Sequence, residues 1–81
     1  MIKESTEKNI PSVGTVSYYL LEYQNPLEFG ISISLDSTGE KCEIPHICSD
    51  EHAALALYKS IVDGCVTPIS IHDIVYDWLC T

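Results

Sequence analysis

Alternating apolar and polar residues predict a β-strand in the middle of the chain. From Glu28 to Asp36 an apolar residue occupies every second position, and glutamate, glycine, serine or aspartate fills the other positions. The apolar positions are Phe29, Ile31, Ile33 and Leu35. A period of two places these side chains on one face of a sheet. Residues 15–24 are rich in β-branched and aromatic residues and predict a second strand.

The strand predicted at residues 15–24 carries large side chains on both faces. One set is Val16, Tyr18 and Leu20, and the other is Tyr19, Leu21 and Tyr23. The alternation alone does not say which set is buried. Asn25 and Pro26 predict a turn after this strand. Residues 41–44 predict a third strand, which Pro45 is expected to end.

After residue 48 the apolar residues recur with a period of about 3.6 positions, which predicts two amphipathic helices. The first is expected to run from an N-cap at Ser49 to about Asp63, with Gly64 as the left-handed residue that ends it. Its apolar positions are Ala54, Leu57, Tyr58, Ile61 and Val62. The second follows a cap at Ser70, with an apolar stripe of Ile71, Ile74, Val75, Trp78 and Leu79. We expect Trp78, the largest of these, to be the buried anchor.

The predicted fold class is α+β, in the order β-β-β-α-α. Consecutive strands joined by short turns form a three-stranded antiparallel meander, and the two amphipathic helices that follow pack on one of its faces. Residues 1–12 mix lysine, glutamate, serine, threonine and asparagine, and we expect them to form a disordered tail. A single α+β domain at residues 13–81 remains.

The charge of the chain makes some partners improbable. Twelve acidic residues against four basic ones give a net charge of −8. A surface of this sign repels phosphate backbones and anionic lipid headgroups, so neither nucleic acid nor a membrane is an expected partner. No segment approaches the ~18 apolar residues of a membrane span, and no export signal is recognisable. We therefore expect a cytoplasmic protein whose four cysteines are reduced thiols.

The densest group of potential metal ligands lies within eleven residues, at Cys42, His46, Cys48 and His52. Thiolate and imidazole are ligands that zinc prefers. The spacing differs from that of paired zinc knuckles, so we interpret these residues as incidental and predict no metal or other cofactor. A metal-binding or thiol-based module remains the alternative function. If the module is thiol-based, Cys48 is the candidate nucleophile, because a helix N-terminus lowers the pKa of a nearby thiol. The negative charges of Asp50 and Glu51 oppose that effect.

Several short segments, in this order and at this spacing, resemble a known family. They are Tyr18-Tyr19-Leu20-Leu21-Glu22, Phe29-Gly30-Ile31-Ser32-Ile33, Ile47-Cys48-Ser49-Asp50, Thr67-Pro68-Ile69, Asp73-Ile74-Val75 and Asp77-Trp78-Leu79. Together they resemble a family of short Firmicute proteins known only as a domain of unknown function. In that family a histidine often follows the Pro-Ile pair, where this chain has Ser70, which argues against essential chemistry there. The resemblance implies a bacterial cytoplasmic setting and brings no activity, cofactor or site residue.

Aromatic side chains are more numerous than one small core requires, and such residues tend to lie at contacts. The candidate contact residues are Tyr18, Tyr19, Leu21, Tyr23 and Tyr76. The sequence contains no phosphate-binding loop or catalytic signature. We therefore predict a non-enzymatic module that binds a protein partner or itself. A homodimer would form through the outer face of the sheet or the free edge of the strand at residues 15–24.

Overall fold

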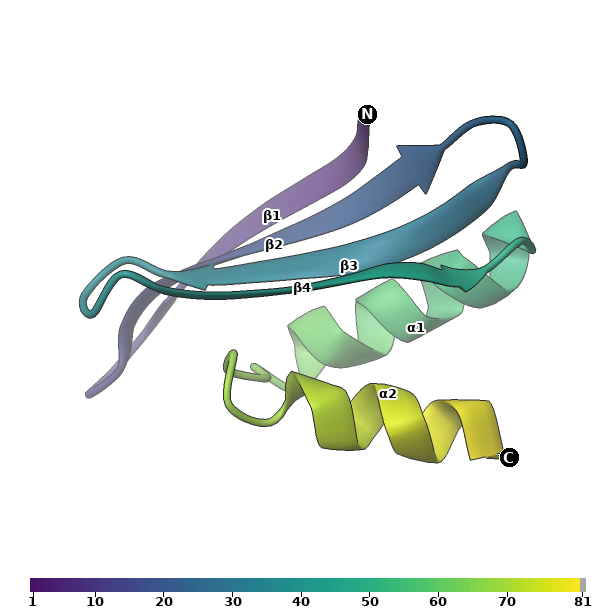
Figure 1. Ribbon diagram of the computed structural model, residues 1–81. Helices are drawn as coiled ribbons and strands as arrows, with labels where there is room; N and C mark the ends of the chain where they lie inside the picture. Colours follow the sequence, from purple (N-terminus) through teal and green to yellow (C-terminus); the bar gives the residue numbers. More distant parts are fainter. Residues whose placement is uncertain (81) are drawn as a thin grey trace.

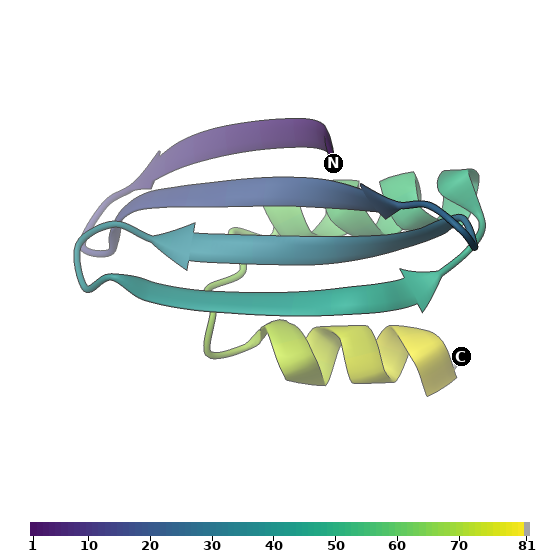
Figure 2. The ribbon, with the colours of Figure 1, turned by 45° about the horizontal axis from the view of Figure 1, so that its top comes forward.

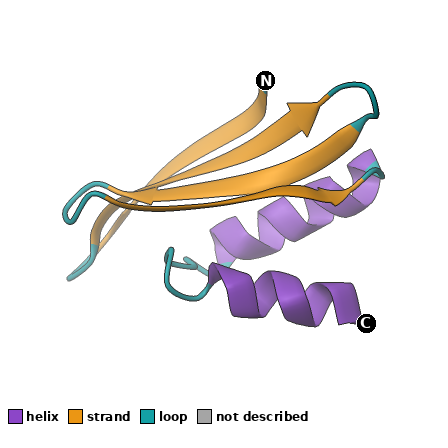
Figure 3. Cartoon of the chain, in the orientation of Figure 1, coloured by secondary structure: helices purple, strands orange, loops and turns teal. Residues whose placement is uncertain are grey.

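A four-stranded sheet covered on one face by two helices forms the molecule (Figures 1 and 3). The computed structural model describes residues 1–80, apart from the side chain of Cys80. The elements in chain order are β1 (Ile2–Ile10), β2 (Gly14–Tyr23), β3 (Glu28–Leu35), β4 (Glu40–Cys48), α1 (Glu51–Asp63) and α2 (Ile71–Cys80). The strands pair in the order β1-β2-β3-β4, each antiparallel to its neighbours. The predicted α+β class and meander are confirmed, but the predicted count of three strands is wrong.

The additional strand is β1, which occupies residues predicted to be a disordered tail. It pairs with β2 from Glu4 opposite Leu20 to Ile10 opposite Gly14. None of its side chains is fully buried, so no apolar pattern marks it in the sequence. Backbone pairing with β2 orders it instead, because a strand edge offers a row of unpaired donors and acceptors to any adjacent segment.

The inner face of the sheet, on the side of the helices, forms the core. Six side chains from β2 and β3 are at most 1% exposed: Val16, Tyr18, Leu20, Phe29, Ile31 and Ile33. The structure therefore decides between the two faces of β2, since the set that contains Tyr18 is the buried one. The Tyr18 hydroxyl donates to the carbonyl oxygen of Val66 at 2.8 Å, so this buried polar group is satisfied.

Helix α1 packs on the inner face through the five apolar residues that its sequence predicts: Ala54, Leu57, Tyr58, Ile61 and Val62. The helix ends at Asp63 as predicted, but its N-cap and its left-handed C-terminal residue each lie one position later than expected. Asp50, and not Ser49, is the N-cap, and its side chain accepts from the backbone N–H of His52 at 3.0 Å. Gly64 has a φ of −80°, and Cys65 is the left-handed residue with a φ of 52°.

Helix α2 lies next to β4 and contributes less to the core than its sequence predicts (Figure 2). Ile71 and Val75 are buried, but Leu79 is 56% exposed and Trp78 only half-buried. Trp78, expected to be the buried anchor, packs against the core but is only partly buried, so Ile71 and Val75 are the buried residues of this helix. The reason is that α2 lies beside β4 at the border of the sheet, so only part of its apolar stripe meets a neighbour. Neither helix within residues 1–80 is long and apolar enough to cross a membrane.

Strand β4 continues past Pro45 to Cys48, although proline was expected to end it at residue 44. It does so through a bulge. Between the pairs Ile31–Ile44 and Phe29–Cys48, β4 advances four residues while β3 advances two. The two extra residues lie within 45–47, and His46 in this segment adopts a φ of 57°. A bulge is a position where a strand tolerates a residue that cannot donate to the ladder.

Candidate interaction surface

The outer face of the sheet, on the side away from the helices, carries a ridge of three large side chains along β2. Tyr19, Leu21 and Tyr23 alternate with the core residues of the same strand and are half-buried. We call these three residues the outer ridge. Both helices lie on the opposite side of the sheet (Figure 1), so the outer ridge has no second layer over it among the described residues.

A strip of small residues on β3 borders the outer ridge. Ser34, Ser32 and Gly30 lie opposite Ser17, Tyr19 and Leu21 respectively. At Gly30 the bulge of β4 approaches closely: a Cβ atom there would be 2.6 Å from the Ile44 carbonyl oxygen. Glycine is therefore required at this position, because the backbones of β3 and β4 leave no space for a side chain.

The same bulge places His46 beside Tyr23 and Glu28, which lie opposite each other on β2 and β3 at one end of the face. The rings of His46 and Tyr23 have centroids 4.5 Å apart at an interplanar angle of 35°. His46 Nδ1 lies 2.9 Å from Glu28 Oε1. This cluster was not predicted, since the extra residues of the bulge are what place His46 beside β2, and nothing in the sequence marks the bulge except Pro45.

The outer face has an acidic border. By register, Glu43 of β4 lies opposite Ser32 and Glu7 of β1 opposite Ser17, which places both on this face. Burial, and then the negative charge of Glu43, raise the pKa of the Tyr23 hydroxyl, so it stays protonated at neutral pH.

A shallow hollow of about 300 Å³ lies between β1 and β2, lined by Ser5, Thr6, Glu7, Ser17 and Tyr19.

Two of the predicted contact residues do not belong to the outer ridge. Tyr18 is fully buried under α1 and is a core residue, so its assignment to a contact surface is wrong. Tyr76 is 69% exposed, but it lies on α2, on the opposite side of the sheet from the outer ridge. The strand at residues 15–24 has no free edge either, because β1 pairs with it. A homodimer through that edge is therefore excluded.

The four candidate metal ligands lie in different surroundings. His46 is on the outer face with Tyr23 and Glu28, whereas Cys42 lies opposite Ile33 on the inner face. His52 belongs to the first turn of α1. Within residues 1–80, apart from the Cys80 side chain, no three potential ligands come together as a metal site. Cys42, Cys48 and Cys65 are free cysteines.

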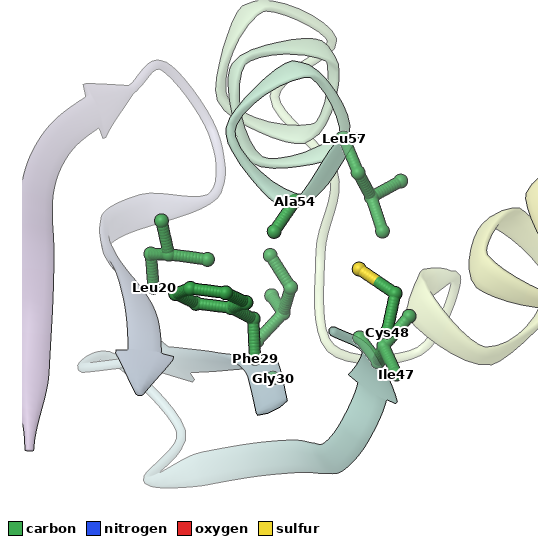
Figure 4. Close-up of a pocket in the computed structure, with 8 residues that line it drawn as sticks. Leu20, Phe29, Gly30, Ile47, Cys48, Ala54 and Leu57 are labelled. Carbon is green, nitrogen blue, oxygen red and sulfur yellow. The ribbon is translucent and has the colours of Figure 1, made fainter. Parts of the chain in front are cut away.

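Cys48 lines a narrow apolar space between the sheet and α1 (Figure 4). Its sulfur points into this space, beside Ala54 and Leu57, where no room for a water molecule remains. Burial raises the pKa of the Cys48 thiol, and the negative charge of Asp50 raises it further against a hydrogen bond to the backbone of Asp50. The thiol is therefore protonated at neutral pH, unlike a nucleophilic cysteine.

Cys42 has a partner that the sequence did not indicate. Its Sγ lies 3.2 Å from Nε2 of His72, the second residue of α2. The two residues are thirty positions apart, so only the docking of α2 against β4 brings them together. Burial raises the pKa of the Cys42 thiol, which keeps it in the neutral form, and we interpret the contact as part of the packing of α2.

The comparisons with known proteins identify a family but no function. A family model matches the chain over residues 1–81, and its description is a family of unknown function, DUF6514. The comparisons with curated proteins and with solved structures give no match.

Proposed function

Because the chain belongs to this family of unknown function, no activity comes to it from relatives, and we propose from its surface that it is a non-enzymatic protein-interaction module. The outer ridge of Tyr19, Leu21 and Tyr23 is its binding surface. The partner is a protein segment that packs apolar side chains on this ridge. The proposal includes a cytoplasmic setting, as the resemblance to bacterial cytoplasmic proteins implies.

The observation that carries the proposal is the contrast between the ridge and its surroundings. Large side chains lie along β2, while β3 carries only glycine and serine opposite Leu21 and Tyr19, and Glu28 opposite Tyr23. Ser32 is only 3% exposed and Gly30 is buried, so a partner contacts the half-buried side chains of the ridge and not the strip beside them. Tyrosine suits such a surface, because it supplies a large apolar area together with a hydroxyl that remains in contact with water.

Charge specifies the chemistry of the partner. Glu7, Glu28 and Glu43 border the outer face, with Lys41 as the basic residue that the register places among them. The whole chain carries a net charge of −8. Complementary potentials speed association and exclude wrong partners, so the expected partner carries lysine or arginine around its apolar contact residues.

The test is partner capture with matched surface variants. Immobilised wild-type chain, the double variant Tyr19→Ser/Leu21→Ser and the control variant Tyr76→Ser are exposed to the cytoplasmic fraction of the native cell. A basic protein should bind the wild type and the control, be released by salt, and fall to about a tenth or less on the double variant, as expected for central contact residues. Circular dichroism first establishes that all three chains are folded.

Two outcomes would contradict the proposal. Equal retention of every protein by all three chains would show that the outer ridge binds nothing. Loss of the partner on the Tyr76→Ser variant alone would move the binding surface to α2. Capture of the chain by its own copies, lost only in the double variant, would identify a second copy as the occupant of the ridge.

A further inference from the structure

The two borders of the sheet differ, and the difference makes β1 the open one. Strand β4 contains the bulge within residues 45–47, and α2 lies alongside it (Figure 2). Strand β1 pairs with β2 alone, and its register is uninterrupted from Glu4 to Ile10. Among the described elements, none lies beyond β1 in Figure 2. A long regular edge of this kind presents unpaired backbone donors and acceptors to another strand.

We propose that β1 pairs antiparallel with β1 of a second copy, with Thr6 on the two-fold axis. The two sheets then continue into one, and both pairs of helices lie on the same side. This proposal goes beyond the proposed function and does not depend on it, because the outer ridge stays open. Its surface is the edge of the sheet and its partner is an identical chain, which gives a closed two-fold contact.

Backbone geometry restricts how two copies of β1 can pair. In an antiparallel ladder, the N–H and C=O groups of one residue point to one side of the strand, and those of the next residue to the other. Residues that lie opposite each other in the dimer must therefore both be odd-numbered or both be even-numbered. This condition excludes the pairing of Lys3 with Lys8, which would also set like charges opposite each other.

Charge selects one of the remaining registers. An axis at Glu4 or at Glu7 would place that carboxylate opposite its own copy, which is destabilising. An axis at Ser5 would require Lys3 to face Glu7. Lys3 flanks the irregularity in the register between Ile2 and Glu4, and its Nζ already lies 3.5 Å from both Glu22 and Glu51.

An axis at Thr6 sets Glu4 opposite Lys8 twice and Ser5 opposite Glu7 twice. All charged pairs directly opposite each other are then of opposite sign. Lys8 Nζ donates to the Val62 carbonyl oxygen at 2.9 Å and lies 3.8 Å from Cys65 Sγ. An ammonium group has three donors, so one N–H remains for the carboxylate of Glu4 from the second copy.

Sedimentation equilibrium of the untagged chain tests the proposal. Between about 10 and 500 µM, the range of a weak dimer, the wild-type mass should rise from that of one chain toward twice that value. The chain mass is 9.0 kDa. Glu4→Lys sets lysine opposite lysine, and Lys8→Glu sets glutamate opposite glutamate. Each variant alone should therefore dimerise about tenfold more weakly or worse.

An equimolar mixture of the two variants should dimerise, because Glu4→Lys in one chain and Lys8→Glu in the other restore both opposite-charge pairs. Glu7→Lys is the control, since it makes the same change in net charge as Glu4→Lys but faces Ser5, and it should dimerise like the wild type. If Lys8→Glu does not fold, the contrast between Glu4→Lys and Glu7→Lys at the exposed edge still decides the test. Circular dichroism checks each variant.

The proposal is overturned if the wild type remains a monomer throughout. A dimer that Glu4→Lys leaves unchanged would also overturn it, since the contact would then lie elsewhere. Dissociation by Glu7→Lys would exclude the axis at Thr6. Loss of partner capture in the outer-ridge variant, with dimerisation intact, would separate this contact from the proposed binding surface.

Discussion

Adjacent residues of β2 point to opposite faces of the sheet and differ in how deeply they are buried. Leu20 is fully buried on the inner face, whereas Leu21, the next residue, is half-buried on the outer ridge. Tyr18 and Tyr19 differ in the same way. Residue type therefore does not distinguish the core from the surface in this strand. The position of α1 makes the distinction, because it covers one face and leaves the other open.

The strands on either side of β2 reinforce this difference. On β3 the inner positions are large and apolar, whereas the outer positions between Gly30 and Ser34 are small. The inner face consequently supplies the stability of the fold. The outer face is free to be selected for binding, since a substitution there removes fewer buried contacts.

The largest effect is expected from a cavity in the inner face. Ile33 is fully buried between its neighbours in β2 and β4, so Ile33→Ala should lower the free energy of unfolding by about 2–5 kcal/mol. Its outer-face neighbour provides the control, and Ser34→Ala should change this free energy by less than about 1 kcal/mol. Urea denaturation measures both. Equal losses in the two variants would break the distinction between the faces.

The next largest loss of stability is expected at Gly30, an outer-face position that does not tolerate a side chain. Gly30→Ala would place its Cβ 2.6 Å from the Ile44 carbonyl oxygen and 2.9 Å from Pro45 Cα. Both are backbone atoms, so the bulge must shift, at a cost of about 1–3 kcal/mol. Thermal unfolding measures the loss. A melting temperature equal to that of the wild type would show that β4 is not held against β3 at the bulge.

A smaller effect is expected from single hydroxyl groups on adjacent tyrosines. Tyr18→Phe removes the donor to the Val66 carbonyl oxygen inside the core and should cost about 1–2 kcal/mol. Tyr19→Phe, on the outer ridge, should cost less than about 0.5 kcal/mol. Urea denaturation of both variants gives the comparison. A larger loss for Tyr19→Phe than for Tyr18→Phe would reverse the assignment of the two faces.

Much of the fold was predictable because its strongest patterns are local. The period of two in β3 and the period of 3.6 in α1 each gave the element and its buried side. β2 was predictable as a strand but not in orientation, since both of its faces are apolar. Its orientation depends on α1, whose Tyr58 hydroxyl lies 3.2 Å from the Tyr18 carbonyl oxygen.

The missed features depend on contacts between distant residues. β1 has no apolar period, and its order comes from pairing with β2 and from contacts such as that of Thr6 Oγ1 with the Tyr58 hydroxyl at 2.8 Å. Likewise, His46 was grouped with nearby cysteines in the sequence, but the bulge directs it to Tyr23. The outer ridge was one of the two sets of large side chains that the sequence places on opposite faces of β2. Only the choice of which set is buried was left open.

The most direct test of the division between the two faces is the free energy of unfolding of Leu20→Ala and Leu21→Ala, measured in parallel by urea denaturation. The chemical change is identical, the residues are adjacent, and only the face differs. Leu20→Ala should lose about 2–5 kcal/mol, a large part of the ~5–10 kcal/mol expected for a domain of this size, and Leu21→Ala about 1 kcal/mol or less. Equal losses, or a larger loss for Leu21→Ala, would contradict the assignment of the inner face to stability and the outer face to binding.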